Sequence, residues 1–248
     1  MAQITSRKNS EIQRLKRLLD DGAFRRSEGV FICHGEVMLA EAIASKMTIE
    51  CVYCTDAMLP AVPAGLKTVT VTPEIIEVIS GVGTSVGLVF TCVLPCAKEF
   101  SGERFIALED VRDPGNVGTI IRTADALGID GVIFVGNCAD CFAPKVVRST
   151  MGSIFRMPLH FCDIEELKSL CHEHNIDVVA AELSTDAQVL GKDPLKTPCC
   201  VMIGNEARGL SQQAIASADR SMIIPMKGAE SLNAAVAASV FMWEMRER

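Results

Sequence analysis

The chain has 248 residues, of which 49% are hydrophobic but only 5% aromatic, and its formal net charge is −7. A core of Val, Ile, Leu, Ala and Met at this length is typical of α/β proteins, whose sheets are covered by helices. The acidic balance argues against a protein that coats nucleic acid indiscriminately, because such binding relies on many phosphate contacts. Eleven cysteines scattered through apolar runs indicate reduced side chains, and disulfides are not expected.

No apolar run approaches the roughly 20 residues that a membrane-spanning helix needs. The N-terminal sequence MAQITSRKNSEIQRLKRLL is polar and lacks the apolar centre of a signal peptide. We therefore expect a cytoplasmic protein with no membrane contact. Within residues 1–30 the basic residues outnumber the acidic ones by three, which fits either an RNA-contacting surface or a solvated helix face.

The predicted elements begin with residues 10–20, SEIQRLKRLLD, whose isoleucine and leucines fall on one helical stripe. Ser10 is the candidate N-cap of this helix and Gly22 its stop signal. The pattern that follows predicts a compact α/β unit with a proline-rich loop at 59–65. Its further elements are strand 30–33, helix 36–45, strand 49–54, strand 68–71, helix 73–79 and strand 87–93.

A domain boundary is predicted at LPCAKEFSGE, residues 94–103, where Pro, Gly, Ser and charged residues interrupt the pattern. We expect an RNA-binding domain at 1–95, a linker at 96–103 and a second domain at 104–248. Strands and helices alternate in the second domain, which predicts a mostly parallel sheet with helices on both faces. The expected elements are strand 105–108, helix 117–127, strand 132–135, helix 143–150, strand 154–159, helix 164–174, strands 178–181 and 200–203, a short helix, strand 221–224 and a last helix.

Glycine loops that cradle nucleotide phosphates are absent from the sequence. Gly81, Gly83 and Gly87 have the wrong spacing for a dinucleotide fingerprint and lead into a strand instead of a helix. No Walker-type loop occurs either. The sequence therefore argues against a nicotinamide-dinucleotide site and disfavours a small-molecule nucleotide enzyme.

Three other blocks place polar residues after predicted strands. In the first, residues 105–128, Asn116 opens a helix and Arg122 follows within two turns. In the second, residues 202–211, an apolar strand runs into Gly204, where backbone can approach a ligand closely. In the third, residues 221–241, a strand is followed by a turn, by Ser231 as candidate helix cap and by a helix rich in alanine. Each block can also be read as ordinary strand, turn and capped helix.

Together these blocks, IALEDVRDPGNVGTIIRTADALG, IGNEARGLS and IPMKGAESLNAAVAA, resemble in order and spacing the three motifs of the SpoU (TrmH) family of RNA 2′-O-methyltransferases. The third block has one residue fewer than usual between Met226 and Glu230. Residues 3–45 are similar to the RNA-binding module of many ribosomal-RNA members of the family. In that module the usual Glu-Gly pair is His34-Gly35, and Val86 replaces a common glutamine.

The resemblance implies S-adenosylmethionine as methyl donor, a ribose 2′-hydroxyl of RNA as acceptor, a homodimer and a deep trefoil knot in the second domain. Ribosomal RNA is the preferred substrate and transfer RNA an alternative. By match to the motifs, the implied catalytic residues are Arg122, Glu206, Ser231, Asn233 and Asn116. The implied cofactor-binding residues are Gly204, Asn205, Ile224, Met226 and Leu232.

Arg122 matches the catalytic arginine of the family, for which two roles stay open. It could act as a base with help from a substrate phosphate, or it could stabilise the developing alkoxide, since a guanidinium stays protonated at neutral pH. Candidate RNA contacts are Arg7, Lys8, Arg14, Arg25 and Arg148.

No metal is expected in this protein. Its two C-x-x-C pairs begin at Cys51 and Cys138 and fall in different predicted domains. The rival from another class is a non-catalytic RNA-binding or assembly protein that kept the knotted fold. The joint presence of Arg122, Glu206, Ser231 and Asn233 argues against that rival.

Overall fold

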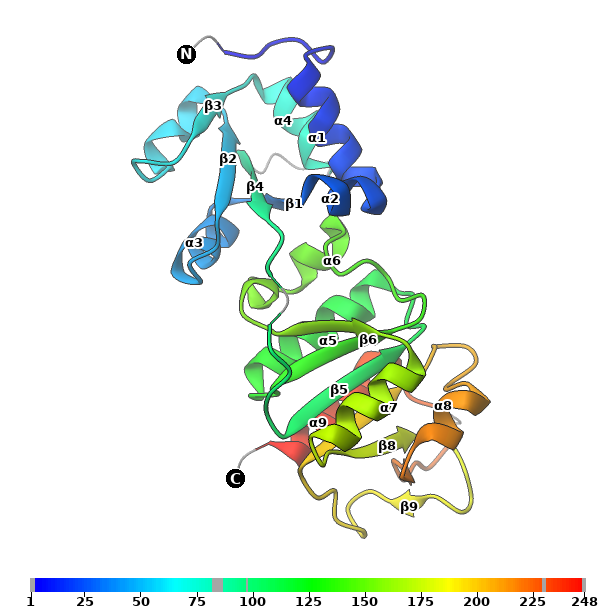
Figure 1. Ribbon diagram of the computed structural model, residues 1–248. Coiled ribbons are helices and arrows are strands. Elements are labelled where there is room, and N and C mark those ends of the chain that lie inside the picture. Colours follow the sequence, from blue (N-terminus) through cyan, green and yellow to red (C-terminus); the bar gives the residue numbers. More distant parts are fainter. Residues whose placement is uncertain (1–2, 82–86, 97, 229–230, 247–248) are drawn as a thin grey trace. The chain divides into compact units, whose positions relative to one another are not determined.

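The computed structural model describes residues 3–81, 87–96, 98–228 and 231–246, and its chain divides into two compact units (Figure 1). The first unit comprises Met1–Cys96 together with Asp140–Phe155, and the second comprises Ala97–Ala139 together with Arg156–Arg248. The chain therefore leaves the second unit after Ala139 and returns to it at Arg156. The domains predicted from the sequence, 1–95 and 104–248, instead assign residues 140–155 to the second domain.

The first unit is built on a four-stranded sheet with the order β1-β4-β2-β3. Strand β4 is antiparallel to both of its neighbours, whereas β2 and β3 are parallel. The strands are β1 (Val30–His34), β2 (Ile49–Cys54), β3 (Thr68–Thr70) and β4 (Leu88–Val93). The helices are α1 (Ser10–Asp20), α2 (Gly22–Glu28), α3 (Glu36–Ala44), α4 (Pro73–Ser80) and α6 (Pro144–Ser149), with 3₁₀ turns η1 (Asp56–Ala61) and η2 (Ser153–Phe155).

Helix α1 confirms the predicted amphipathic helix, since Ile12, Leu15 and Leu18 are fully buried in the core of the unit. Its N-cap is Asn9 and not Ser10, because the Asn9 side chain accepts a hydrogen bond from the amide of Glu11. The chain then begins a second helix at Gly22, which the sequence does not predict. Asp21 caps that helix by accepting a hydrogen bond from the amide of Phe24.

Residues 140–155 belong to the first unit through a buried ion pair and through aromatic packing. Arg25 donates hydrogen bonds to the carbonyls of Leu18 and Leu19, and its Nη2 lies 2.7 Å from Oδ2 of Asp140. The ring of Phe31 in β1 lies 5.0 Å from that of Phe142. These contacts tie the returning segment to α1, α2 and β1.

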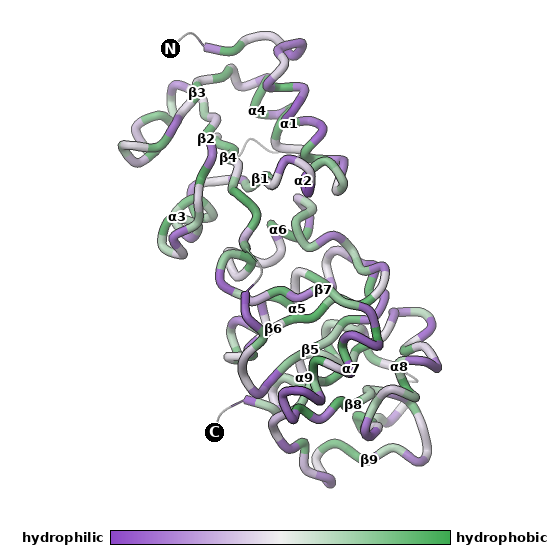
Figure 2. The backbone as a smooth tube through the Cα atoms, in the orientation of Figure 1, coloured by the Kyte–Doolittle hydropathy of each residue, from purple (hydrophilic) through white to green (hydrophobic). Residues whose placement is uncertain are grey.

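The second unit is built on a seven-stranded sheet with the order β7-β6-β5-β10-β8-β11-β9, in which every pair is parallel. Figure 2 shows its central strands as mainly hydrophobic, in line with the complete burial of β6 and β10. The strands are β5 (Arg104–Glu109), β6 (Gly131–Val135), β7 (Leu159–Cys162), β8 (Asp177–Ala181), β9 (Gln188–Val189), β10 (Cys199–Ile203) and β11 (Arg220–Ile223). The helices are α5 (Pro114–Ala126), α7 (Ile164–Glu173), α8 (Gln212–Ser217) and α9 (Ala234–Met245).

Helices cover both faces of this sheet, as the alternation of elements predicts. On one face α7 and α8 pack over a core formed by alternate strand residues, among them Phe105, Val178 and Met202. On the other face α5 and α9 contact each other, with α5 against β6 and α9 against β5 and β10. The predicted α/β class with a parallel sheet is confirmed. The predicted knot stays a prediction, because strand order does not test how the chain is threaded.

One local prediction in this part of the chain is wrong, and one short strand is missed. Residues 154–159 do not form a strand: Ile154 and Phe155 form the buried turn η2 of the first unit, and β7 begins only after Pro158. A short apolar run fits a buried turn as well as a strand, so periodicity alone does not separate them. Strand β9 is not predicted, because its two residues carry no pattern.

Among the described residues no helix has the length and apolar character required to cross a bilayer. The other predicted elements agree with the helices and strands above, with boundaries that differ by a few residues.

Candidate functional site

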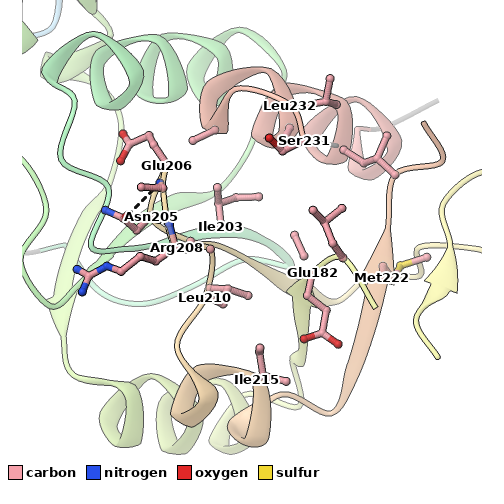
Figure 3. Close-up of a pocket in the computed structure, with 18 of the residues that line it drawn as sticks. Glu182, Ile203, Asn205, Glu206, Arg208, Leu210, Ile215, Met222, Ser231 and Leu232 are labelled. Carbon is pink, nitrogen blue, oxygen red and sulfur yellow. Dashed lines mark hydrogen bonds between the residues drawn. The ribbon is translucent and has the colours of Figure 1, made fainter. Parts of the chain in front are cut away.

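A cavity of about 570 Å³ opens at the carboxyl ends of β8, β10 and β11 (Figure 3). Ligands of α/β proteins bind at this edge of a sheet, and pockets for small molecules are of this size. The cavity is lined by residues that follow the three strands and by the start of α9. Its walls include Glu182, Ile203, Gly204, Asn205, Glu206, Arg208, Leu210, Ile215, Met222, Ile224, Met226, Ser231 and Leu232. All five predicted cofactor-binding residues are therefore brought to one cavity.

Gly204 stands where the chain folds tightly back on itself. A Cβ atom at this position would lie 2.2 Å from the carbonyl carbon of Gly209 and from the amide nitrogen of Leu210. Asn205 and Gly209 exchange two backbone hydrogen bonds, of 3.1 and 2.8 Å. The close approach that the sequence predicts at Gly204 is thus an approach of the loop 204–209 itself, and this loop forms one wall of the cavity.

The side chain of Asn205 joins two loops at the strand ends. Its Oδ1 accepts hydrogen bonds from the amides of Ala207 and Arg208, and its Nδ2 donates to the carbonyl of Asp110 at 2.9 Å. Asn205 therefore shapes the cavity through the backbone around it.

Glu206 binds the loop that leads into α5. Its carboxylate accepts hydrogen bonds from the amides of Arg112 (3.3 Å) and Asp113 (3.1 Å) and from Nδ2 of Asn116 (2.9 Å). Burial alone would raise the pKa of Glu206, but these donors outweigh it and hold the pKa below its ordinary value. The ionised carboxylate thus fixes the start of α5.

A chain of side-chain hydrogen bonds continues from Glu206 to α9. Asn116, which is buried, accepts at Oδ1 from Nδ2 of Asn233 at 3.0 Å. Asn233 in turn caps α9, because its Oδ1 accepts from the amides of Ala235 and Val236. The prediction that Ser231 caps this helix is wrong. Three of the predicted catalytic residues, Glu206, Asn116 and Asn233, are therefore joined in one hydrogen-bonded chain.

Asn116 and Asn233 also line a shallower groove of about 410 Å³ between α5 and α9. Its other walls are Thr119, Ala235, Val236, Ser239, Val240 and Trp243. The hydrogen-bonded chain thus has Glu206 in the wall of the cavity and the two asparagines in the wall of the groove.

Arg122 and Ser231 occupy different places around these two hollows. Ser231 lines the cavity, next to Leu232. Arg122 is exposed on α5, one turn beyond Thr119, so it lies on the groove side of the helix and not in the cavity. Within the described part of the chain its guanidinium has no hydrogen bond or ion pair. An exposed cation beside the groove can meet an anionic ligand there.

Three residues at which the sequence departs from the motifs of the family or lies next to such a departure are outside the described residues. They are Val86, Ala229 and Glu230.

Two acidic residues at the strand ends, Glu109 and Glu182, are not among the predicted site residues. Glu109, at the end of β5, accepts hydrogen bonds from the amide (2.7 Å) and hydroxyl (2.6 Å) of Ser211, which caps α8. Glu182, directly after β8, faces the cavity. The signal available for both was a charged residue at the end of an apolar run.

The predicted RNA contacts lie in three kinds of surroundings. Arg7 and Lys8 are exposed. Arg14 is bound by the carboxylates of Glu11, Glu28 and Glu50, and Arg25 is buried with Asp140. Arg148 is half-buried, and burial lowers its pKa. The carboxylate partners give Arg14 and Arg25 structural roles, whereas Arg7 and Lys8 present their charge to solvent.

No cluster of three or more His, Cys, Asp or Glu side chains that could hold a metal ion occurs in the ranges described above. The cysteines in those ranges are all free.

The chain is similar to known proteins in both of its units. The family model described as SpoU rRNA Methylase family matches residues 103–243, and that described as MRM3-like substrate binding domain matches residues 9–89. The chain is 28% identical to the 23S rRNA (guanosine(2553)-2′-O)-methyltransferase RlmP of Bacillus subtilis, over 99% of this chain and 100% of that protein. It is 37% identical to the 23S rRNA (uridine(2479)-2′-O)-methyltransferase of Streptomyces viridochromogenes, over 62% of this chain and 55% of that protein.

Solved structures agree over nearly the whole chain. The AdoMet-bound rRNA methyltransferase from Sinorhizobium meliloti superposes with a TM-score of 0.88 at 29% identity, covering 98% of this chain and 96% of that one. The SpoU methyltransferase AviRb from Streptomyces viridochromogenes, in complex with AdoMet, superposes with a TM-score of 0.86 at 27% identity, covering 96% of this chain and 97% of that one. The resemblance found in the sequence is confirmed: the chain belongs to the SpoU rRNA methylase family and is an RNA methyltransferase of that family.

Proposed function

We propose that this protein transfers a methyl group from S-adenosylmethionine to a ribose 2′-hydroxyl of ribosomal RNA. The observation that carries the proposal is that one chain of hydrogen bonds connects the cavity with the groove. Glu206 lies in the wall of the cavity, and Asn116 and Asn233 lie in the wall of the groove. A transferase needs such an arrangement, because the donor and the acceptor must be held side by side.

The cavity suits the methyl donor. Its size is that of a small-molecule pocket, and Ile203, Leu210 and Met222 offer apolar contacts to an adenine ring. Gly204, Asn205, Ile224, Met226 and Leu232 would hold the cofactor, largely through the backbone around them. When bound, S-adenosylmethionine supplies an electrophilic methyl group on its sulfonium. Two relatives of the same fold, from Sinorhizobium meliloti and Streptomyces viridochromogenes, were solved with AdoMet bound.

The groove suits the acceptor ribose. Arg122 is exposed on the groove side of α5, and a guanidinium stabilises the negative charge that develops on the 2′-oxygen as its proton leaves. Asn116 and Asn233 are held in place by Glu206 and by the first turn of α9, so they orient the ribose. Ser231, in the cavity wall, lies at the side from which the methyl group must come.

The first unit supplies RNA affinity in this proposal. The family model for a substrate binding domain spans residues 9–89 of it, and Arg7 and Lys8 are exposed just before that range. Ribosomal RNA is the substrate class because the relatives that the chain matches along its whole length carry that substrate in their names.

The proposed reaction is tested by incubating the protein with methyl-labelled S-adenosylmethionine and separate pools of unmodified ribosomal and transfer RNA. We expect label in ribosomal RNA, at one nucleotide whose 3′-phosphodiester has become resistant to alkali, since a 2′-O-methyl group blocks that cleavage. Label in transfer RNA alone would favour the transfer-RNA alternative. No label in either pool, with S-adenosylhomocysteine still bound, would favour the non-catalytic rival.

We further propose that the part of this groove formed by Val236 and Trp243 of α9, and not the part formed by its two asparagines, is the contact surface of a homodimer. Val236 and Trp243 lie two turns apart on α9 and are 48% and 53% exposed, although both are apolar. A second copy of the chain would cover them and would bring its own Arg122 to the same surface.

Replacing Val236 with glutamate is expected to weaken dimerisation by at least about tenfold, because an apolar contact would be lost and a carboxylate would have to give up its hydration on association. Sedimentation at micromolar concentration measures the change. The matched control is Val37→Glu in α3 of the first unit, where the valine is 65% exposed. A monomeric wild type, or a Val236→Glu variant that dimerises like the wild type, would rule out this interface.

A further inference from the structure

Glu182 is an acidic side chain in the wall of the cavity. Within the described part of the chain its carboxylate has no hydrogen bond or ion pair. The other charged residues of the wall are engaged: Glu206 binds the start of α5, and Nη2 of Arg208 lies 3.9 Å from Oδ2 of Asp110. A carboxylate left free in a pocket wall is a candidate for contact with the ligand.

The backbone fixes the direction in which Glu182 points. Its amide donates to the carbonyl of Met222 at 3.2 Å, so the residue continues the pairing of β8 with β11 by one position. Val178 and Ala180 of β8 face the core under α7 and α8, and Glu182 has the same parity. Figure 3 agrees, since it shows Glu182 on the side of the cavity that carries Leu210 and Ile215, away from Ser231 and Leu232.

The surroundings of Glu182 decide which part of the methyl donor it can meet. Leu210, Ile215 and Met222 make this side apolar, which suits the adenosine half of the molecule. The methionine half carries a carboxylate next to its ammonium group, so the repulsion of Glu182 by the one offsets its attraction to the other. A ribose diol has no such conflict, because both hydroxyls donate and an ionised carboxylate has two acceptor oxygens.

We propose that Glu182 accepts hydrogen bonds from the ribose hydroxyls of the adenosine moiety, and so determines affinity for the nucleoside half of the methyl donor. An acidic side chain plays this part at a strand end in dinucleotide-binding folds, where it binds the ribose hydroxyl. The inference rests on the proposed function, because it takes the cavity to be the donor site.

The test is calorimetric titration of the full-length protein with S-adenosylhomocysteine and with 5′-methylthioadenosine, which lacks the amino-acid half. Glu182→Ala is expected to lower the affinity for both ligands by about tenfold or more, since hydrogen bonds to a charged acceptor are lost. The affinities of Glu182→Gln are expected to lie between those of the alanine variant and the wild type, because the amide keeps one acceptor oxygen. Glu173→Gln is the matched control: that glutamate is exposed on α7, outside the cavity wall.

Thermal unfolding without ligand verifies that the variants keep their fold. Loss of affinity for S-adenosylhomocysteine alone would overturn the ribose assignment and place the carboxylate at the amino-acid half. Unchanged affinity for both ligands would overturn any direct contact. A wild type that binds neither ligand would overturn the proposed function together with this inference, so the two failures are distinguishable.

Discussion

Replacing Arg122 with alanine is expected to lower the rate of methyl transfer by about 10²–10³-fold, the usual effect of removing one group that stabilises a developing oxyanion. Affinity for S-adenosylhomocysteine should stay within about twofold of the wild type, because Arg122 lies beside the groove and not in the wall of the cavity. Single-turnover transfer to ribosomal RNA and calorimetric titration with S-adenosylhomocysteine measure the two quantities separately.

Arg122→Lys separates the two roles that the arginine could have. A lysine keeps the positive charge but lacks the planar fork, so a charge-stabilising role predicts partial activity with the same dependence on pH as the wild type. A role as base predicts instead that the lysine variant gains activity as the pH rises, because an ammonium group loses its proton more readily than a guanidinium. An alanine variant that turns over within a few-fold of the wild-type rate would show that Arg122 is not catalytic.

The wall of the cavity shows what local sequence signals can predict. Gly204 and Ile224 each follow an apolar run that reads as a strand, and parallel strands all end at the same edge of their sheet. Residues directly after such runs converge in space whatever the order of the strands. The sequence could therefore place these residues around one ligand without knowing that β10 lies between β5 and β8.

The contacts of the catalytic candidates are not predictable in this way. The hydrogen bond from Asn233 to Asn116 joins residues 117 positions apart, and no local pattern specifies it. Ser231 and Asn233 are both good N-cap residues, so local preference does not choose between them. Asn233 caps α9 in the structure, and its Nδ2 donates a hydrogen bond to Oδ1 of Asn116. Glu206 likewise holds a loop that only the parallel pairing of β5 and β10 brings near it.

The same limit applies to the arginines of the first unit. Their charge in the sequence suggests contacts with RNA, but the structure surrounds Arg14 with three carboxylates and buries Arg25 with Asp140. Asp140 lies 115 positions from Arg25, in a segment that the sequence assigns to the other domain. Charge counts along the chain cannot identify partners at such separations, and it is these partners that decide whether a cation is free.

The second large effect is expected from Asp140→Ala, which should destabilise the first unit by about 3 kcal/mol, because it leaves the guanidinium of Arg25 buried and without its ionic partner. The side chain of Arg25 is only 5% exposed. The matched control is Asp125→Ala, which removes the partner of Arg156 at a similar distance, 2.8 Å against 2.7 Å, but from a side chain that is 41% exposed. Exposed pairs contribute less than about 1 kcal/mol, so the control should change stability little.

Urea unfolding can assign the loss of stability to one unit, because the chain has a single tyrosine and a single tryptophan. Tyr53 is buried in the first unit and Trp243 lies on α9 of the second. A loss of about 3 kcal/mol at an m-value of roughly 1–3 kcal/mol per molar urea moves a midpoint by about 1 M or more. We expect Asp140→Ala to move the transition reported by Tyr53 and to leave that reported by Trp243 in place. A shift of the tryptophan signal alone would show that residues 140–155 stabilise the second unit, as the domain boundaries predicted from the sequence imply.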